Sequence, residues 1–275
     1  MTAADGPSFG GGFATVASVS VAPNLVTPVH ASVPTLPRGR KTICPLGPLW
    51  RTMLSAVMED YIKAIYSIQD KSDERVSTSE LAGYLDVTSP TVSSMLTKLE
   101  QRGLIDREEY RGVTLTEEGE VVALEILRHH RLLEAFLTEH LDYDWADVHE
   151  EADRLEHHVS DELTERIAET LDDPGVDPHG DPIPDADLEL PDPGETSRLS
   201  MAEEGNTVVV QRIRHQGDEE LRYLSGAGIE PGVELEVLEI APFGLVTVET
   251  PAGEQSLPED IAGIIETAPA TEAEV

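Results

Sequence analysis

Hydrophobic residues recur with the period of an α-helix along several stretches between residues 54 and 141. The second stretch begins with a capping-box pattern formed by Ser77 and Glu80. In the third, Ser89 suits the N-cap and Pro90 the first helical position, where its missing N–H is unpaired anyway. The first stretch, residues 54–69, carries its apolar stripe at Val57, Tyr61, Ala64, Ile65 and Ile68.

Two short strands are predicted after the third helix, which Gly103 ends. The segments LIDRE and VTLT resemble the arms of a hairpin around a turn. Two short helices joined by a tight turn and followed by such a hairpin form a winged helix-turn-helix. Thr116 can then cap a long helix, and a further helix follows DYDWAD; both carry apolar stripes that could pack in a bundle or across a dimer.

The pattern changes in the last third of the chain. Six prolines between Asp172 and Ser197 predict a linker that is stiff in parts. Beyond it, TVVVQRI, VELEVLEI and LVTVET alternate like half-buried strands of a small barrel or sandwich. The expected fold is mainly α, with an N-terminal winged helix-turn-helix, a helical domain and a small C-terminal β-barrel.

The composition is strongly acidic, since 19 Lys and Arg oppose 54 Asp and Glu and give a net charge of −35. Such an excess strains a compact fold unless salt screens it, because the Debye length falls to about 3 Å near 1 M salt. The even spread of acids indicates a salt-loving organism, with a merely acidic protein as the alternative. No apolar run reaches the roughly 18 residues of a membrane span and no signal peptide is apparent, so we expect a cytoplasmic protein without a membrane partner.

The first 52 residues do not share this acidity. They contain one acid, Asp5, and four bases, and they are rich in Gly, Pro, Ser and Val. We expect a disordered leader or a gene start assigned too early, with Met53 or Met58 as the true first residue. The only cysteine, Cys44, lies here, so disulfides, zinc fingers and cysteine nucleophiles are excluded for the rest of the chain.

The exposed side of the third helix carries small hydroxyl residues, flanked by basic ones. Small side chains let a helix approach the major groove closely, and hydroxyls bond to phosphates and bases. Because only 15 bases follow residue 52, their gathering here favours a DNA-binding surface; the alternative is a polar face for protein contact. The candidate contacts are Thr88, Ser89, Pro90, Thr91, Ser93, Ser94, Lys98, Arg107 and Arg111.

A second polar pattern combines carboxylates and histidines at helical spacing. On a helical wheel, four residues share a stripe about 100° wide beside the apolar face, namely His149, Asp153, Glu156 and His157. His130 and Glu134 form an i, i+4 pair on the apolar face of the preceding helix. A divalent cation held by oxygen and imidazole nitrogen would offset the cost of burying these charges. The alternatives are an acidic helix face that arises by chance and an ordinary His–Glu salt bridge.

The sequence contains little that points to an enzyme. The zinc-protease motif His-Glu-x-x-His is not formed, because position 153 is Asp. Neither a nucleophile elbow nor a phosphate-binding loop appears, so a metal-storage or scavenging enzyme lacks a catalytic constellation. We therefore expect a regulator and not an enzyme.

The motifs MEDYIKAIY, TSPTVSSMLTKLEQRGLI, YRGVTLTEEG, HHRLLEAFL and DRLEHHVSDEL, in this order, resemble the diphtheria-toxin-repressor family of iron- and manganese-dependent transcription repressors. HGDPIP is similar to the segment before the family's third domain, and LSGAGIEPGVELEV to that SH3-like, FeoA-type domain. The resemblance runs from about Met53 to Ala268. It implies a metal-loaded homodimer that binds a pseudo-palindromic operator in double-stranded DNA and represses metal-uptake genes.

The resemblance also implies functions for the parts of the chain. The expected parts are a disordered leader or mis-assigned start (1–52), a winged helix-turn-helix DNA-binding domain (53–118), a metal-binding and dimerisation domain (119–171), a Pro-rich linker (172–197), a FeoA-type domain (198–268) and a tail (269–275).

Two metal sites are implied by the same resemblance. The first joins the first helix to the dimerisation domain, and the matching positions are Asp60, Asp153, Glu156 and His157. The second uses His130, Glu134 and His149, completed by a ligand from the third domain. Glu220 best matches that last ligand, with Asp218 as the alternative.

The expected metal follows from departures from the family pattern. Iron-type members have Met and Cys where this chain has Asp60 and Asp153, and losing both sulfurs favours Mn²⁺ over softer ions. Manganese-type members share the first Asp but have Glu where this chain has Lys63. They usually also lack the third domain. We expect Mn²⁺, with Fe²⁺ close behind; the alternative is a winged-helix regulator that responds to an organic ligand or to none.

Overall fold

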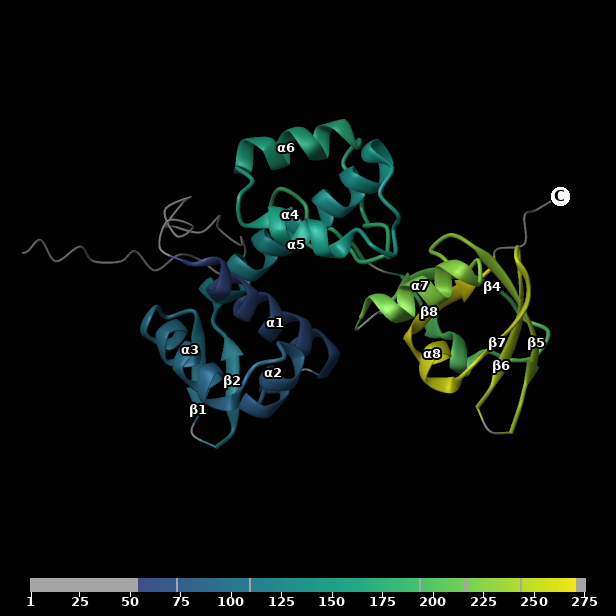
Figure 1. The fold of residues 1–275 in the computed structure, drawn as a ribbon, viewed down its shortest axis with the longest axis horizontal. Helices are drawn as coiled ribbons and strands as arrows, with labels where there is room; N and C mark the ends of the chain where they lie inside the picture. The colour runs from purple at the N-terminus through teal and green to yellow at the C-terminus, as the bar shows by residue number, and fades with distance from the viewer. Residues whose placement is uncertain are drawn as a thin grey trace, which may run out of the picture. The chain divides into compact units, whose positions relative to one another are not determined.

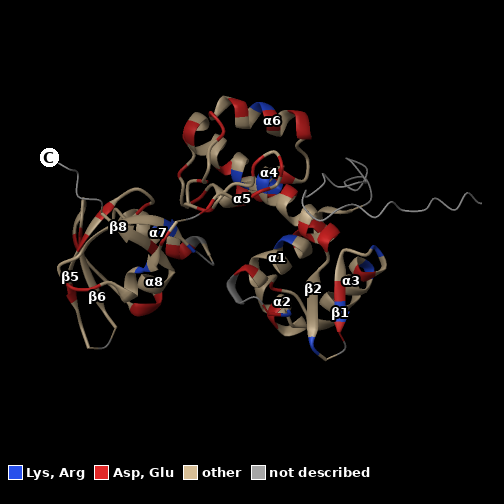
Figure 2. Ribbon diagram, turned by 180° about the vertical axis from the view of Figure 1, so that it is seen from behind, with Lys and Arg blue, Asp and Glu red and all other residues tan. Residues whose placement is uncertain are grey.

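The computed structural model describes residues 54–72, 74–108, 110–192, 194–214, 217–242 and 244–270. The expected leader, Cys44 and most of the expected tail lie outside these residues. Among the residues described, no helix combines the length and apolar composition that crossing a bilayer requires. Figure 2 shows acidic residues on nearly every element and few basic ones between them.

The first domain is a winged helix-turn-helix, as the pattern predicts (Figure 1). The capping box is present, because Ser77 Oγ accepts from the Glu80 N–H and Glu80 Oε2 accepts from the Ser77 N–H. The strands pair antiparallel as the wing. Its elements are α1 (Ala56–Ser72), α2 (Thr78–Tyr84), α3 (Ser89–Gln101), β1 (Ile105–Glu108) and β2 (Gly112–Leu115).

Two details of this domain differ from the predicted pattern. Helix α3 begins one residue earlier than expected, with Thr88 in place of Ser89 as N-cap, and the Thr88 hydroxyl bonds to that of Thr91 at 2.9 Å without capping a backbone N–H. Val57 is 52% exposed, so its predicted core position is wrong. Tyr61, Ala64 and Ile65 are buried as predicted, and Met58 and Ile62 are buried beside them.

The second domain consists of α4 (Glu117–Leu141), α5 (His149–Glu156) and α6 (Asp161–Thr170). Thr116 caps α4 as expected, accepting from the Gly119 N–H. A further helix follows DYDWAD as predicted, but the helical pattern is divided in two. Helix α5 ends at Glu156, and Ser160 caps α6 by accepting from the Leu163 N–H. This break leaves His157 at the end of a helix.

Part of the predicted linker is packed. Val176 and Pro182 form a β-bridge, and Ile183 lies in the apolar core of the second domain. Asp177 and His179 are buried beside it. The turn requires Gly180, whose φ is +84° and where an added Cβ would lie 2.1 Å from the Gln211 carbonyl oxygen of β4 (Thr207–Ile213).

The third domain is a six-stranded antiparallel sheet in the order β3–β8–β4–β5–β6–β7 (Figure 1). No pairing joins β3 to β7 among the described residues, so the predicted closed barrel is corrected to an open sheet, and the whole fold is mixed helix and sheet, not mainly α. Helix α7 was not predicted. The elements are β3 (Ser197–Arg198), η2 (Leu199–Met201), β4 (Thr207–Ile213), α7 (Asp218–Gly226), β5 (Glu234–Ile240), β6 (Val246–Thr250), β7 (Gly253–Leu257), α8 (Glu259–Ile264) and β8 (Ile265–Pro269).

Gly119 fixes how closely the start of α4 approaches the wing. A Cβ at this position would lie 1.9 Å from the Leu104 carbonyl oxygen, whereas a Cβ at Gly83 in α2 would meet nothing within 4 Å. We expect Gly119→Ala to lower the free energy of unfolding by about 1–3 kcal/mol, as overpacking does. Gly83→Ala should raise it by up to about 1 kcal/mol through helix propensity. Denaturant unfolding at constant salt measures both, and equal effects would contradict the close approach.

Candidate metal centre

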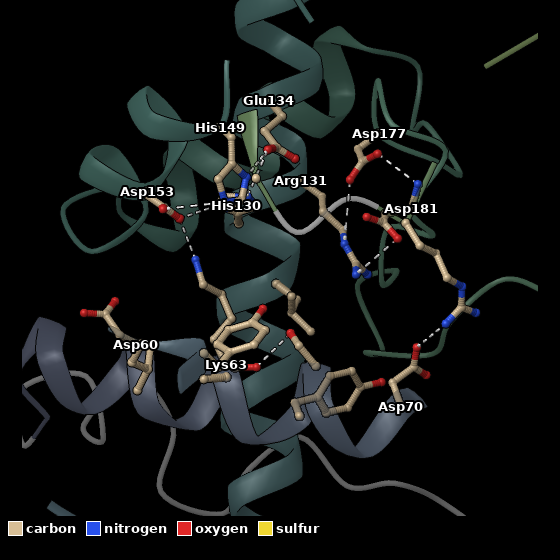
Figure 3. Close-up of a pocket in the computed structure, with 18 of the residues that line it drawn as sticks. Asp60, Lys63, Asp70, His130, Arg131, Glu134, His149, Asp153, Asp177 and Asp181 are labelled. Carbon is tan, nitrogen blue, oxygen red and sulfur yellow. Dashed lines mark hydrogen bonds and ion pairs between the residues drawn. The ribbon is translucent and has the colours of Figure 1, made fainter. Parts of the chain in front are cut away.

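Acidic and imidazole side chains from three helices converge on one side of α4 (Figure 3). Asp60 comes from α1, His130 and Glu134 from α4, and His149 and Asp153 from α5. Glu156 is the last residue of α5, and His157 follows it directly. Seven of the eight metal ligands expected from the sequence therefore belong to this cluster, which opens onto a cleft of about 790 Å³.

Asp60, Glu156 and His157 form the first group of candidate ligands. Nε2 of His157 lies 3.0 Å from Asp60 Oδ1 and 3.6 Å from Glu156 Oε1. Nδ1 of the same ring lies 2.6 Å from Glu59 Oε2, which orients the imidazole. Bonding to Asp60 and Glu59 raises the pKa of His157 to about 9 against the effect of burial.

His130 belongs to two further groups, one on each side of its ring. Nδ1 lies 2.6 Å from Glu156 Oε2 and 3.4 Å from Asp153 Oδ1. Nε2 lies 3.0 Å from Glu134 Oε1, and that oxygen lies 2.9 Å from Nδ1 of His149. Burial alone would lower the pKa of His130, but the surrounding carboxylates, Glu134 foremost, raise it to about 10.

The two rings and the carboxylates fit a divalent cation. In each group the ligand atoms lie within 4.8 Å of one another. Protein ligands bound at about 2.1–2.5 Å from one cation stand roughly 3 Å apart, so only small shifts would be required. All donors are carboxylate oxygen or imidazole nitrogen, the set that suits Mn²⁺ and Fe²⁺ and offers no sulfur to softer ions.

Lys63 is a member of the cluster that the sequence pattern did not identify. Its Nζ donates to Asp153 Oδ1 at 2.7 Å and to the two oxygens of Glu156 at 2.7 and 2.9 Å. Burial would lower its pKa, but these two carboxylates raise it above the ordinary value. The spacing along α1 could have indicated this position, because Lys63 lies about one helical turn after Asp60 and therefore on the same face of the helix.

A fourth group lies deeper and was also missed. Nδ1 of His179 lies 3.7 Å from Glu134 Oε2 and 3.9 Å from Asp177 Oδ1, and all three residues are buried. Nε2 of His179 bonds to the Trp145 carbonyl oxygen at 2.8 Å. Burial and the charge of Asp181 raise the pKa of Asp177 to about 8. The proline-rich composition of this segment predicted a linker, so Asp177 and His179 were not considered as ligands.

Glu220 is not brought to this cluster. It lies in α7, and its Oε2 would lie 3.1 Å from a Cβ on Gly217. It belongs to none of the candidate metal groups of the described residues. The side chain of Asp218, the alternative ligand, lies outside what is described.

The candidate DNA-binding residues lie on one exposed surface of α3 and the wing. Thr88, Ser89, Pro90, Thr91, Ser94 and Lys98 are exposed, and Ser93 is half-buried. Arg107 and Arg111 are exposed on the wing, where Arg111 pairs with Glu108 at 2.9 Å. The apolar side of α3 is buried through Val92, Leu96 and Leu99, so its hydroxyl-rich side must face outward.

Family models match most of the described chain. Residues 53–113 match the N-terminal DNA binding domain of the iron dependent repressor, and residues 116–185 match its metal binding and dimerisation domain. Residues 197–269 match the FeoA domain. The three matches follow the order of the three folded parts described above.

Characterised relatives extend over most of the chain. The iron-dependent repressor IdeR of Mycobacterium tuberculosis is 34% identical over 217 residues, covering 74% of this chain and 93% of the relative. The diphtheria toxin repressor of Corynebacterium efficiens is 34% identical over 189 residues, covering 66% of this chain and 82% of the relative. A solved manganese-dependent transcriptional repressor in complex with manganese is 40% identical, with a TM-score of 0.70, covering 78% of this chain and 100% of that one. The manganese regulator SloR is 33% identical with a TM-score of 0.65, covering 78% of this chain and 98% of that one.

The same three parts thus recur in the same order, and the relatives are matched almost from end to end. We conclude that this chain belongs to the family of iron-dependent repressors that includes IdeR and the diphtheria toxin repressor.

Proposed function

We propose that this protein is a metal-dependent transcriptional repressor, not an enzyme, that binds operator DNA when Mn²⁺ or Fe²⁺ is bound. The observation that carries the proposal is the convergence of Asp60 from the DNA-binding domain with Glu156 and His157 from the dimerisation domain. Relatives named iron-dependent repressor and manganese-dependent transcriptional repressor support it. Because its partner is DNA, we expect the protein to act in the cytoplasm.

The residues of this chain would hold the metal in distinct ways. Asp60, Glu156 and His157 would form the site that joins α1 to α5. Asp153, the fourth ligand predicted for this site, groups with His130 and Glu156 beside it. Glu134 and His149 would bind with His130 at a second site next to it. A bound divalent cation supplies positive charge that draws these carboxylates together. Glu59 would hold the His157 ring in the orientation that presents Nε2.

Manganese and iron remain the proposed ions because every donor is oxygen or imidazole nitrogen. Affinity for most first-row metals rises from Mn²⁺ to Cu²⁺, so selection must come from ligand type and geometry. Asp60 and Asp153 supply hard oxygen donors. No Cys side chain belongs to any of the candidate groups of the described residues.

We propose that metal controls the spacing of two recognition helices in a homodimer. Reading heads of a dimer must lie about one DNA turn, roughly 34 Å, apart to bind a pseudo-palindromic operator. A metal that binds the DNA-competent arrangement more tightly shifts the population toward it. Lys63 of α1 bonds to Asp153 and Glu156 of α5, and we call this contact the joint between the two helices. A preference of the metal for one arrangement of the dimer would change the geometry of this joint.

A regulator that is not controlled by metal is the second candidate. It is favoured by one observation, namely that Lys63 and His130 already bring positive charge to Asp153 and Glu156. Removing metal with EDTA distinguishes the two candidates. Release from the operator supports metal control, and unchanged DNA binding supports the second candidate.

The first test of metal control is Glu156→Gln. Glu156 belongs to two of the candidate groups, and the amide would remove its charge while keeping its size. We expect manganese-dependent operator affinity to fall at least about tenfold, a loss of roughly 1.4 kcal/mol, with the chain still folded. Glu162→Gln, at an exposed position of α6, is the matched control. Wild-type manganese dependence of Glu156→Gln in a gel shift would refute the assignment.

The second test addresses the DNA-binding surface. Thr91→Glu places a negative charge in the first turn of α3, where the helix dipole favours it, so the fold should survive. We expect operator binding to weaken at least about tenfold because the charge faces phosphates. Manganese binding should be unchanged. Thr170→Glu on α6 is the control, and equal DNA affinity of the two variants would exclude α3 as the reading surface.

The third test uses pH. Metal binding requires neutral imidazoles, whereas the pKa values of about 10 for His130 and about 9 for His157 keep both charged at neutral pH without metal. Manganese affinity should therefore rise from pH 6.5 to pH 8.5. Both folded-state values lie above the unfolded value of about 6.5, so the stability they give the metal-free protein is full below pH 6.5 and is lost toward pH 9–10.

Unfolding temperatures with EDTA and with saturating manganese measure both trends. The gap between the two temperatures should widen as the pH rises. A gap that narrows between pH 6.5 and pH 8.5 would show that these histidines do not lose protons when metal binds.

A further inference from the structure

Lys63 projects from α1 into the cluster of candidate ligands (Figure 3). Its ammonium contacts one oxygen of Asp153 and both oxygens of Glu156, all between 2.7 and 2.9 Å. The Lys63 side chain is only 16% exposed, and the Glu156 side chain is fully buried. An ammonium surrounded in this way by carboxylates takes the position that a bound cation would take.

This ion pair differs from an ordinary surface salt bridge. Exposed pairs contribute little because water and salt screen them, whereas this pair is largely shielded from solvent. Its partners are separated by 90 and 93 residues, and they belong to the DNA-binding domain and the dimerisation domain. Removing one partner would leave buried charge without compensation, which is strongly unfavourable. The ammonium is therefore a connection between α1 and α5.

The position of the ammonium divides the two groups that share Glu156. It lies against Asp153 and Glu156, which belong with His130 to one group. The other group is formed by Asp60, Glu156 and His157. Of these three residues, only Glu156 takes part in the three hydrogen bonds of the ammonium described above. A divalent ion bound by His130, Asp153 and Glu156 would be repelled by the adjacent ammonium. It would also compete with the ammonium for the same carboxylate oxygens.

We propose that the Lys63 ammonium substitutes for one metal ion at the joint between α1 and α5. The joint then binds one divalent cation at Asp60, Glu156 and His157, and Lys63 neutralises the adjoining group of His130, Asp153 and Glu156. The same ammonium holds α1 to α5 when metal is removed. The metal part of this inference rests on the proposed function, and the connection between the helices does not.

The experiment compares the full chain with Lys63→Gln, which removes the charge, and Lys63→Arg, which keeps it. Arg154→Gln is the matched control, because it removes one positive charge from the exposed side of α5, the helix that carries Asp153 and Glu156. Bound manganese per chain is measured by equilibrium dialysis and elemental analysis. Electron paramagnetic resonance of the bound Mn²⁺ reports whether two ions lie close together.

We expect Lys63→Gln to bind one more manganese ion per chain than the wild type. Its spectrum should be broadened by coupling between ions that share Glu156. Its unfolding temperature in EDTA should fall by several degrees, because Asp153 and Glu156 lose their counter-charge. Lys63→Arg and Arg154→Gln should match the wild type in both measurements.

If the wild type and Lys63→Gln bind the same number of manganese ions per chain, the proposal that Lys63 takes the place of a metal ion is refuted. This holds for any value of that number. An unchanged unfolding temperature of Lys63→Gln in EDTA would overturn the connection between the helices. A wild-type count of zero would refute the proposed function separately, since the EDTA comparison does not depend on metal. If Lys63→Gln unfolds in EDTA, its count is taken in manganese, where the additional ion replaces the lost charge.

Discussion

The arrangement of the first two domains depends on the burial of one carboxylate. Glu156 is fully buried at the end of α5, and its two oxygens accept from Lys63 of α1 and bond to His130 of α4. A buried carboxylate without such partners would be protonated or exposed to water. The partners instead lower its pKa against the effect of burial. Ion pairs of Glu156 thus join α1, α4 and α5, in addition to the apolar packing between the helices.

This point lies within an unusually acidic chain. With a net charge of −35, acidic side chains repel one another across the surface. The buried cluster nevertheless contains three groups that can carry positive charge, namely Lys63, His130 and His157. Salt screens exposed charges much more than buried ones. High salt would therefore weaken the general repulsion and leave the interactions around Glu156 largely intact.

The sequence was sufficient for the parts of the fold that follow from local pattern. The capping box at Ser77, the cap at Thr116 and the apolar face of α3 were predicted from spacing and are present. Periodicity did not locate the break after His157, because the run up to Leu163 remains helical in pattern and only the Ser160 cap and tertiary packing divide it. The closed barrel was likewise wrong, since alternation predicts strands but does not determine which edges pair.

The same limit applies to the site. The helical wheel and the family resemblance identified seven residues that the fold brings together, but they could not show which cation the carboxylates face. Lys63 was recognised only as a departure from a family pattern, and its contacts cross more than 90 residues of sequence. Asp177 and His179 were hidden by a proline-rich context that indicates exposed chain. Glu220 was matched through the third domain, where the resemblance was loosest, and it belongs to none of the candidate metal groups that the described residues form.

The packed segment that contains Gly180 limits how far the third domain can be regarded as an independent module. The Ile213 N–H of β4 donates to the His179 carbonyl oxygen, and Gly180 leaves no room for a side chain beside Gln211. The buried side chains of Asp177 and His179 consequently lie beside a backbone hydrogen bond that joins their segment to β4. A chain shortened before β3 would lose the Ile213 N–H and the Gln211 carbonyl that lie against this segment, and Asp177 and His179 would become more accessible to water.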